Sequence, residues 1–240
     1  TSQWLGGLYF LFSLFLLSSS SKAKPKKDIL SYDSTNLIEI KKQYTKVIII
    51  YSLLTIFIFL ILNFSGIRLF ESFNLSMTII STGGFVPTDF LTDIIKLDSQ
   101  KTILSFLMLI PLFNLYLLYN FFSFKKLLHN YQEDFYLLVF LLFILIFTYL
   151  FFNDIYEFRA VLFAVISSLS SIGVGLDSEI SHLSVFLLIL TIVGGSSFST
   201  TSGLKFIKIY ILSKFSLEEI YLIVKPHFIS NKTLFLSKYK

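Results

Sequence analysis

The sequence reads Ser81-Thr82-Gly83-Gly84-Phe85 directly after an apolar run, residues 69–80. That run is too short to cross a hydrocarbon core of roughly 30 Å. Irregular backbone at membrane depth is tolerated only where it is buried in protein or lines a water-filled cavity. The same arrangement recurs 89 residues later, where residues 162–169 lead into Ser170-Ser171-Ile172-Gly173-Val174. Longer apolar segments flank each short run, so the order span, half-span, glycine loop, span occurs twice. We call residues 81–85 the first glycine loop and residues 170–174 the second.

The composition indicates a membrane protein. Of the 240 residues, 55% are hydrophobic and 15% are charged, with a mean hydropathy of +0.77. A soluble domain is typically about 45–50% apolar and about 25% charged. Several apolar runs approach or exceed about 18 residues, the length expected of a membrane-crossing helix. We therefore predict an all-α membrane protein built from repeated helix–pore loop–helix units. The absence of cysteine excludes thiolate metal sites and disulfides.

The apolar segments divide the chain into five predicted parts. Full spans are predicted at residues 47–64, 103–122 and 135–152. The chain starts without Met and without the basic region of a signal peptide, so we interpret it as a fragment with an incomplete first repeat. The parts are the last helix of that repeat (1–21), a basic cytoplasmic linker (22–46), a second helix–pore–helix repeat (47–126), a third repeat with a broken last helix (127–214) and a cytoplasmic amphipathic tail (215–240).

The lysines and arginines predict the orientation in the membrane. If the half-spans re-enter rather than cross, residues 22–46, 123–134 and 204–240 share one side and hold 16 of the 20 Lys and Arg residues. The positive-inside rule then places these segments in the cytoplasm and both glycine loops at the outer face. The two repeats have the same orientation, which argues against the inverted repeats of many secondary transporters.

The residue types of the glycine loops suit a bound cation. A cation that leaves water needs replacement oxygens, which rings of backbone carbonyls supply. Glycine allows carbonyls to point inward at little steric cost, and each half-span ends at its loop with the negative end of the helix dipole. Serine and threonine add hydroxyl oxygens. We predict that the filter carbonyls bind the ion, through the residues Ser81, Thr82, Gly83, Gly84, Phe85, Ser170, Ser171, Ile172, Gly173 and Val174.

A third irregular segment, residues 194–203, interrupts the last membrane span. We call it the intramembrane loop. It is predicted to lie one layer below the filter as a flexible constriction, although a small-residue face for helix packing is the alternative. Lys205 and Lys208 either extend to the cytoplasmic interface or act in gating or ion repulsion. The predicted gate residues are Gly194, Gly195, Ser196, Ser197, Ser199, Thr200, Thr201, Ser202, Gly203 and Lys205.

With these segments in order, the chain resembles the Trk/Ktr/HKT superfamily of potassium transporters, most closely the TrkH-like membrane subunit. The matching segments are Gln3-Trp4-Leu5-Gly6-Gly7 after the family's first filter, the two glycine loops as its second and third filters, the intramembrane loop with Lys205, and Lys225-Pro226-His227. The resemblance implies four covalent repeats around a pseudo-fourfold pore, a membrane homodimer and a cytosolic, nucleotide-binding TrkA-like regulatory subunit. It also implies a multi-pass location in the cell inner (cytoplasmic) membrane, K⁺ as the transported ion, no organic cofactor and no nucleic-acid partner.

The leading hypothesis is therefore the pore-forming subunit of a K⁺ uptake system, gated by residues 194–203. A Na⁺ or mixed cation transporter of the same superfamily is one alternative. A secondary transporter with broken helices is another, but it predicts inverted repeats and a carboxylate buried inside a span, and the sequence has neither. A membrane enzyme is not expected, because no HExxH motif, Ser/His/Asp set or carboxylate pair within a span is present.

Overall fold

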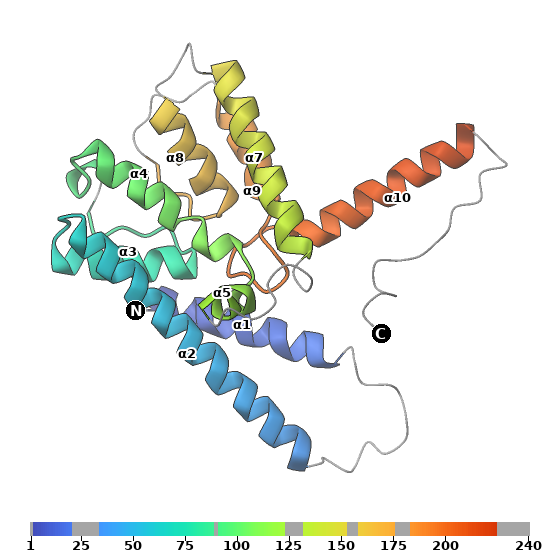
Figure 1. The fold of residues 1–240 in the computed structure, drawn as a ribbon, viewed down its shortest axis with the longest axis horizontal. Coiled ribbons are helices and arrows are strands. Elements are labelled where there is room, and N and C mark those ends of the chain that lie inside the picture. The colour runs from blue at the N-terminus through green and yellow to red at the C-terminus, as the bar shows by residue number, and fades with distance from the viewer. Residues whose placement is uncertain are drawn as a thin grey trace. The chain divides into compact units, whose positions relative to one another are not determined.

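The computed structural model describes residues 2–20, 34–88, 91–122, 132–152, 158–175 and 183–224, which are almost entirely helical (Figure 1). The elements are α1 (Ser2–Ser20), α2 (Ser34–Phe64), α3 (Leu69–Ser81), η1 (Leu91–Asp93), α4 (Asp98–Leu107), η2 (Ile110–Leu112), α5 (Leu115–Phe122), α7 (Gln132–Phe152), α8 (Phe158–Leu169), α9 (Ser184–Ile192) and α10 (Phe206–Val224). The chain forms two compact units, Thr1–Phe206 and Ile207–Lys240. All predicted filter and gate residues lie in the first unit.

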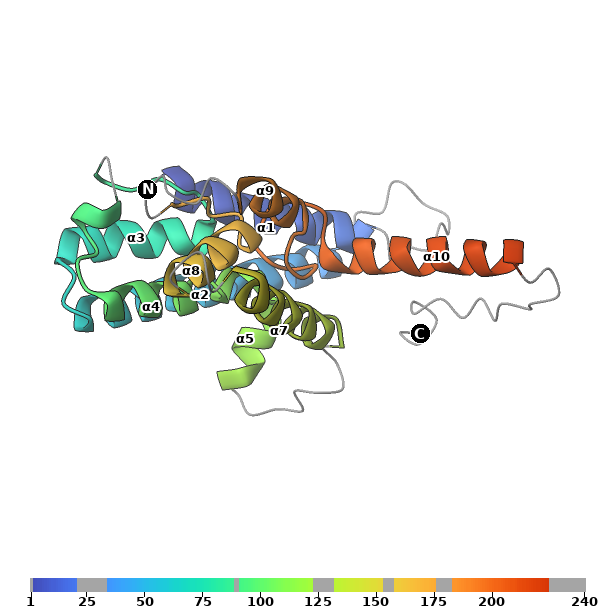
Figure 2. The same ribbon diagram turned by 90° about the horizontal axis from the view of Figure 1, so that it is seen from above.

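The core of the first unit has two apolar clusters. One is formed mainly by α1, α2, α3 and α4, and the other by α7, α8, α9 and the residues around Leu112. The half-helix α3 contacts both α1 and α2, while α8 contacts α4, α7 and α9 (Figure 2). Each predicted half-span is therefore a short helix packed among neighbouring helices.

Two described helices are long and apolar enough to cross a membrane, Tyr44–Phe64 within α2 and Glu133–Phe151 within α7. The helix α2 begins at Ser34, within the predicted linker of residues 22–46. Residues 34–46 contain no Pro or Gly and are rich in Leu, Ile, Lys, Glu and Gln, which favour helix. Helix α2 therefore begins with a more polar part that precedes its apolar part.

The predicted span at residues 103–122 is interrupted. Helix α4 ends at Leu107, four residues before Pro111, whose ring clashes with the carbonyl at that position and which has no N–H to donate. A 3₁₀ turn follows, and α5 begins at Leu115. The Asn114 side-chain oxygen accepts the Tyr116 N–H at 2.9 Å, which is an N-cap. The predicted full span at residues 103–122 is therefore two helices with a break at Pro111.

Helix α10 also differs from the prediction, because it runs without interruption to Val224 across the expected boundary at residues 214 and 215. No Gly or Pro lies between residues 206 and 224 to end it. The hydroxyls of Ser213 and Ser216 donate to carbonyls four residues earlier and stay within the helix. The predicted Lys225-Pro226-His227 segment lies outside the described residues.

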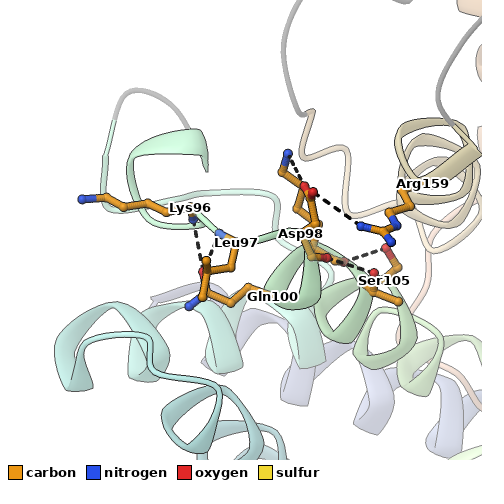
Figure 3. A network of polar contacts seen from close by, with 8 residues as sticks. Lys96, Leu97, Asp98, Gln100, Ser105 and Arg159 are labelled. Atoms are coloured by element: carbon orange, nitrogen blue, oxygen red, sulfur yellow. Dashed lines mark hydrogen bonds and ion pairs between the residues drawn. The ribbon is translucent and has the colours of Figure 1, made fainter.

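Charged residues join the starts of α4 and α8 (Figure 3). The Asp98 carboxylate lies 3.4 Å from Arg159 and 3.2 Å from Lys101. Gln100 accepts the N–H groups of Lys96 and Leu97 at 3.1 and 3.2 Å and so caps the start of α4. The Asp98 carboxylate thus links the start of α4 to the start of α8.

Candidate functional site

Both half-helices end in the same hydrogen-bonded turn. In α3 the Thr82 N–H bonds to the Ile79 carbonyl at 3.1 Å and the Gly83 N–H to the Thr78 carbonyl at 3.0 Å. At the end of α8, the Ser171 N–H bonds to the Ser168 carbonyl at 3.0 Å and the Ile172 N–H to the Ser167 carbonyl at 3.1 Å. These residues lie 89 positions after their counterparts in α3. This is the Schellman motif, which needs one residue in the left-handed region. That residue is Thr82 (φ 51°) in the first loop and Ser171 (φ 57°) in the second.

A hydroxyl on each half-helix then fixes the backbone of its own loop. Thr78 donates to the carbonyl of Phe85 at 2.6 Å, and Ser167 donates to the carbonyl of Val174 at 2.7 Å. The two pairs are again related by the 89-residue offset. Thr78 and Ser167 are not among the predicted filter residues, although the same 89-residue offset identifies both.

The two glycine loops are in direct contact. Gly84 has φ +72° and Gly173 has φ +71°, so the chain reverses at equivalent positions. A Cβ atom on Gly84 would overlap the carbonyl oxygen of Ile172, so glycine is required there for close approach as well as for its backbone conformation. The structure therefore places the carbonyl-bearing segments of the two loops side by side.

The N-terminal motif, residues 3–7, packs against the first glycine loop. A Cβ on Gly83 would lie 2.7 Å from the Gln3 side chain, and a Cβ on Gly7 would lie 3.0 Å from the Ser81 backbone and 2.6 Å from the Tyr51 hydroxyl. A Cβ at either position would force these neighbours to move, so the two glycines allow α1 to lie close to the end of α3 and to α2. The motif thus buttresses the loop.

The intramembrane loop is closed at its base. The Gly194 N–H donates to the Leu204 carbonyl at 2.8 Å, and the Leu204 N–H donates to the Ile192 carbonyl at 2.9 Å. This forms an isolated parallel bridge between Val193 and Leu204. The Phe206 N–H adds a bond to Gly195 at 3.0 Å. The chain therefore leaves α9 and starts α10 at adjacent points, with the loop between them.

The interior of this loop is filled by polar groups, with the Lys205 ammonium among them. Lys205 is 9% exposed, and its Nζ donates to the Ser199 and Thr201 carbonyls at 3.0 and 2.8 Å and to the Ser199 hydroxyl at 3.0 Å. The Thr201 hydroxyl oxygen accepts the Gly195 N–H at 2.8 Å. Of the two roles left open for Lys205, extension to the interface is wrong, because the ammonium points into the loop.

The intramembrane loop touches the first glycine loop. The Thr82 hydroxyl donates to the Ser81 carbonyl at 2.8 Å and lies 3.2 Å from the Thr200 carbonyl. In the described part of the chain, the buried Ser171 Oγ and Thr200 Oγ1 have no hydrogen-bond partner. An unpaired buried hydroxyl is unfavourable by about 1–3 kcal/mol, which makes such oxygens available to a cation. No group of three His, Cys, Asp or Glu residues suited to a metal occurs among the described residues.

The intramembrane loop also bonds to the break between α4 and α5. The Ser196 N–H donates to the Leu112 carbonyl at 2.9 Å, and the Leu115 N–H donates to the Phe198 carbonyl at 3.1 Å. Backbone groups that the α4–α5 break leaves without a helical partner therefore form hydrogen bonds with the intramembrane loop. Lys208 is exposed.

No family model matches the chain. It is 29% identical over 240 aligned residues to an uncharacterized cation transporter of Methanocaldococcus jannaschii, and the alignment covers 93% of this chain and 47% of that protein. Its fold is similar to the crystal structure of the potassium transporter TrkH from Vibrio parahaemolyticus, with a TM-score of 0.79 and 21% identity over 95% of this chain and 50% of that one. The chain spans about half the length of the relatives that it matches.

The described residues therefore have the fold of TrkH-like membrane transporters. The predicted all-α membrane fold and the predicted resemblance to that group are confirmed. The roles assigned to the glycine loops and to the intramembrane loop go beyond a likeness of fold and are argued next from the chain's own contacts.

Proposed function

We propose that the chain forms part of the pore of a Trk-type system for K⁺ uptake across the cytoplasmic membrane. The observation that carries this proposal is the contact between two glycine loops that repeat at an offset of 89 residues. Both loops follow a half-helix, both end it with a Schellman motif, and Gly84 meets the Ile172 carbonyl. Carbonyls held in this way replace the hydration shell of a cation.

Ion coordination in the first loop uses Ser81, Thr82, Gly83, Gly84 and Phe85, and in the second Ser170, Ser171, Ile172, Gly173 and Val174. The hydrogen bonds from the Thr78 and Ser167 hydroxyls hold the carbonyls of Phe85 and Val174 in place. A filter must hold its oxygens at distances suited to one ion, so hydrogen bonds that fix the loop backbone support selectivity. The C-terminal ends of α3 and α8 add the negative ends of two helix dipoles.

The intramembrane loop acts as the gate in this proposal. It lies in contact with the first glycine loop through Thr82 and Thr200, so it is positioned to obstruct the path of an ion that leaves the filter. The relatives' length and the likeness to TrkH support assembly with further repeats, a membrane homodimer and a cytosolic, nucleotide-binding TrkA-like regulatory subunit. A multi-pass location in the inner membrane belongs to the same proposal.

Growth of cells that lack K⁺ uptake tests this function. The complete protein is expressed at low external K⁺, with and without Gly84→Arg, and Ser99→Arg serves as the control, since Ser99 is exposed in α4 and lies outside both glycine loops. We expect rescue by the unchanged protein and by the control, and none by the Gly84 variant. Equal rescue by all three would remove Gly84 from the ion path. Uptake of K⁺ and Na⁺ measured in the same cells separates K⁺ transport from a Na⁺ or mixed cation transporter.

A further inference from the structure

Two adjacent acidic residues at the start of α7 bond to both interrupted helices. The Glu133 carboxylate accepts the Ser197 N–H at 2.8 Å and the Ser197 hydroxyl at 3.0 and 2.8 Å from its two oxygens. The Asp134 carboxylate accepts the Asn114 N–H at 2.9 Å. Neighbouring residues of a helix point in different directions, so one helix end reaches two separate segments.

An acidic residue in the first turn of a helix is stabilised by the helix dipole without any partner. That explanation is insufficient here, because each carboxylate is bonded to a residue of another segment. Asp134 is 4% exposed, a burial that is rare for a carboxylate unless it is hydrogen-bonded. The partners of both residues lie where a helix is broken and where backbone groups need acceptors.

The Glu133 bonds fix the intramembrane loop to a rigid element. Together with the bond from Ser196 to Leu112 and the bond from Leu115 to Phe198, they join residues 196–198 to both α7 and the α4–α5 break. A displacement of this loop must therefore break the charge-assisted bonds between Ser197 and Glu133, which are stronger than bonds between neutral groups.

We propose that Glu133 is the positioning residue that latches the intramembrane loop in the conformation seen here, with Asp134 fixing the α4–α5 break against which the loop rests. The latch links the loop to α7, so that a movement of the start of α7 releases it. The consequence for ion flux rests on the proposed function, whereas the latch itself is a statement about the mobility of the loop.

The test measures loop opening directly. The chain has no cysteine, so Thr200→Cys in the complete protein, freed of any other cysteine, is a single reporter for a small water-soluble thiol reagent. Thr200 is 7% exposed and its hydroxyl has no partner, so this change breaks no hydrogen bond. In this background Glu133→Gln is compared with Asp93→Asn, an exposed acidic residue on η1. Loss of charge-assisted bonds should raise the labelling rate roughly tenfold or more in E133Q, and D93N should match the unchanged protein.

Ser197→Ala provides a second, milder variant that removes only the hydroxyl bonds. It should raise labelling about threefold to tenfold, by the same bond energies. Because both changes act on one contact, the double variant should label about as fast as E133Q alone. A general loss of structure would instead multiply the effects of the two changes. Unchanged labelling in both single variants, or fully additive effects, would overturn the proposal, and S197A decides the matter if E133Q does not fold. Faster labelling without K⁺ or Na⁺ flux in any protein would uphold the latch and reject the proposed transport.

Discussion

Replacing Gly84 with alanine tests the contact between the two glycine loops. Gly84 has φ +72°, a conformation that disfavours any residue with a Cβ by roughly 1–2 kcal/mol. The new methyl group would in addition overlap the Ile172 carbonyl oxygen, and the two loops would have to separate by more than about 0.5 Å before the Cβ reached even a 3.0 Å contact. The atom that must give way is backbone, so no side-chain rotation relieves it.

The expected magnitude has two parts. Backbone strain contributes roughly 1–2 kcal/mol, and forcing a methyl group into a packed contact contributes roughly 1–3 kcal/mol more. Gly66, between α2 and α3, provides the matched control, because it has φ +88° but a Cβ there would meet its nearest atom, Gln100 Nε2, at an ordinary 3.9 Å. Gly66→Ala thus reports the strain without the clash.

The assay is cation uptake by purified complete protein in proteoliposomes, with thermal unfolding measured in parallel. We expect G66A to lose stability but keep uptake close to that of the unchanged protein. G84A should lose more stability, and its uptake should fall by about tenfold or more, because displaced filter carbonyls no longer match the ion. Equal uptake in the two variants would show that the approach of Gly84 to Ile172 has no part in transport, and the reasoning would fail.

Three further predictions follow from contacts near the loops. Thr78→Val removes the hydroxyl that fixes a filter carbonyl, so stability should fall by about 1 kcal/mol and the preference for K⁺ over Na⁺ in competitive uptake should decrease; an unchanged ion ratio would contradict this. Lys205→Met leaves two loop carbonyls without their charged donor and should lower the free energy of unfolding by about 1.5–3 kcal/mol, whereas Lys208→Met at an exposed position should change it by less than about 0.5 kcal/mol. Gly7→Ala should destabilise by about 1–3 kcal/mol because its Cβ meets backbone and a buried hydroxyl, while Gly6→Ala, which meets no atom within 4 Å, should be neutral or stabilising in thermal unfolding.

The repeated part of the fold could be predicted from the sequence. Half-spans that are too short to cross a membrane, followed by glycine, correctly predicted α3 and α8 and the equivalence of Gly84 with Gly173, because length and glycine act locally. The start of α2 and the end of α10 were harder to predict. Charged residues ended the apolar pattern before the helix itself ended, since a helix continues into water wherever no residue breaks it.

The contacts that organise the intramembrane loop could not be predicted in the same way. Glu133 was interpreted as a residue of a polar loop, yet its partner Ser197 lies 64 residues away. Pro111 did indicate a weak point, but the extent of that break depends on bonds with residues 196–198, which no local pattern encodes. Lys205 was correctly associated with the loop, whereas the direction of its side chain followed only from the carbonyls that surround it.

The bridge between Val193 and Leu204 brings the two ends of the intramembrane loop together. The arrangement of the helices therefore does not depend on the length of the segment between them. Because the two ends of the loop are adjacent, residues can be added or removed between them without changing the distance between these ends. Insertions or deletions within residues 199–202 would therefore change the length of this loop while the bridge at its base stays in place.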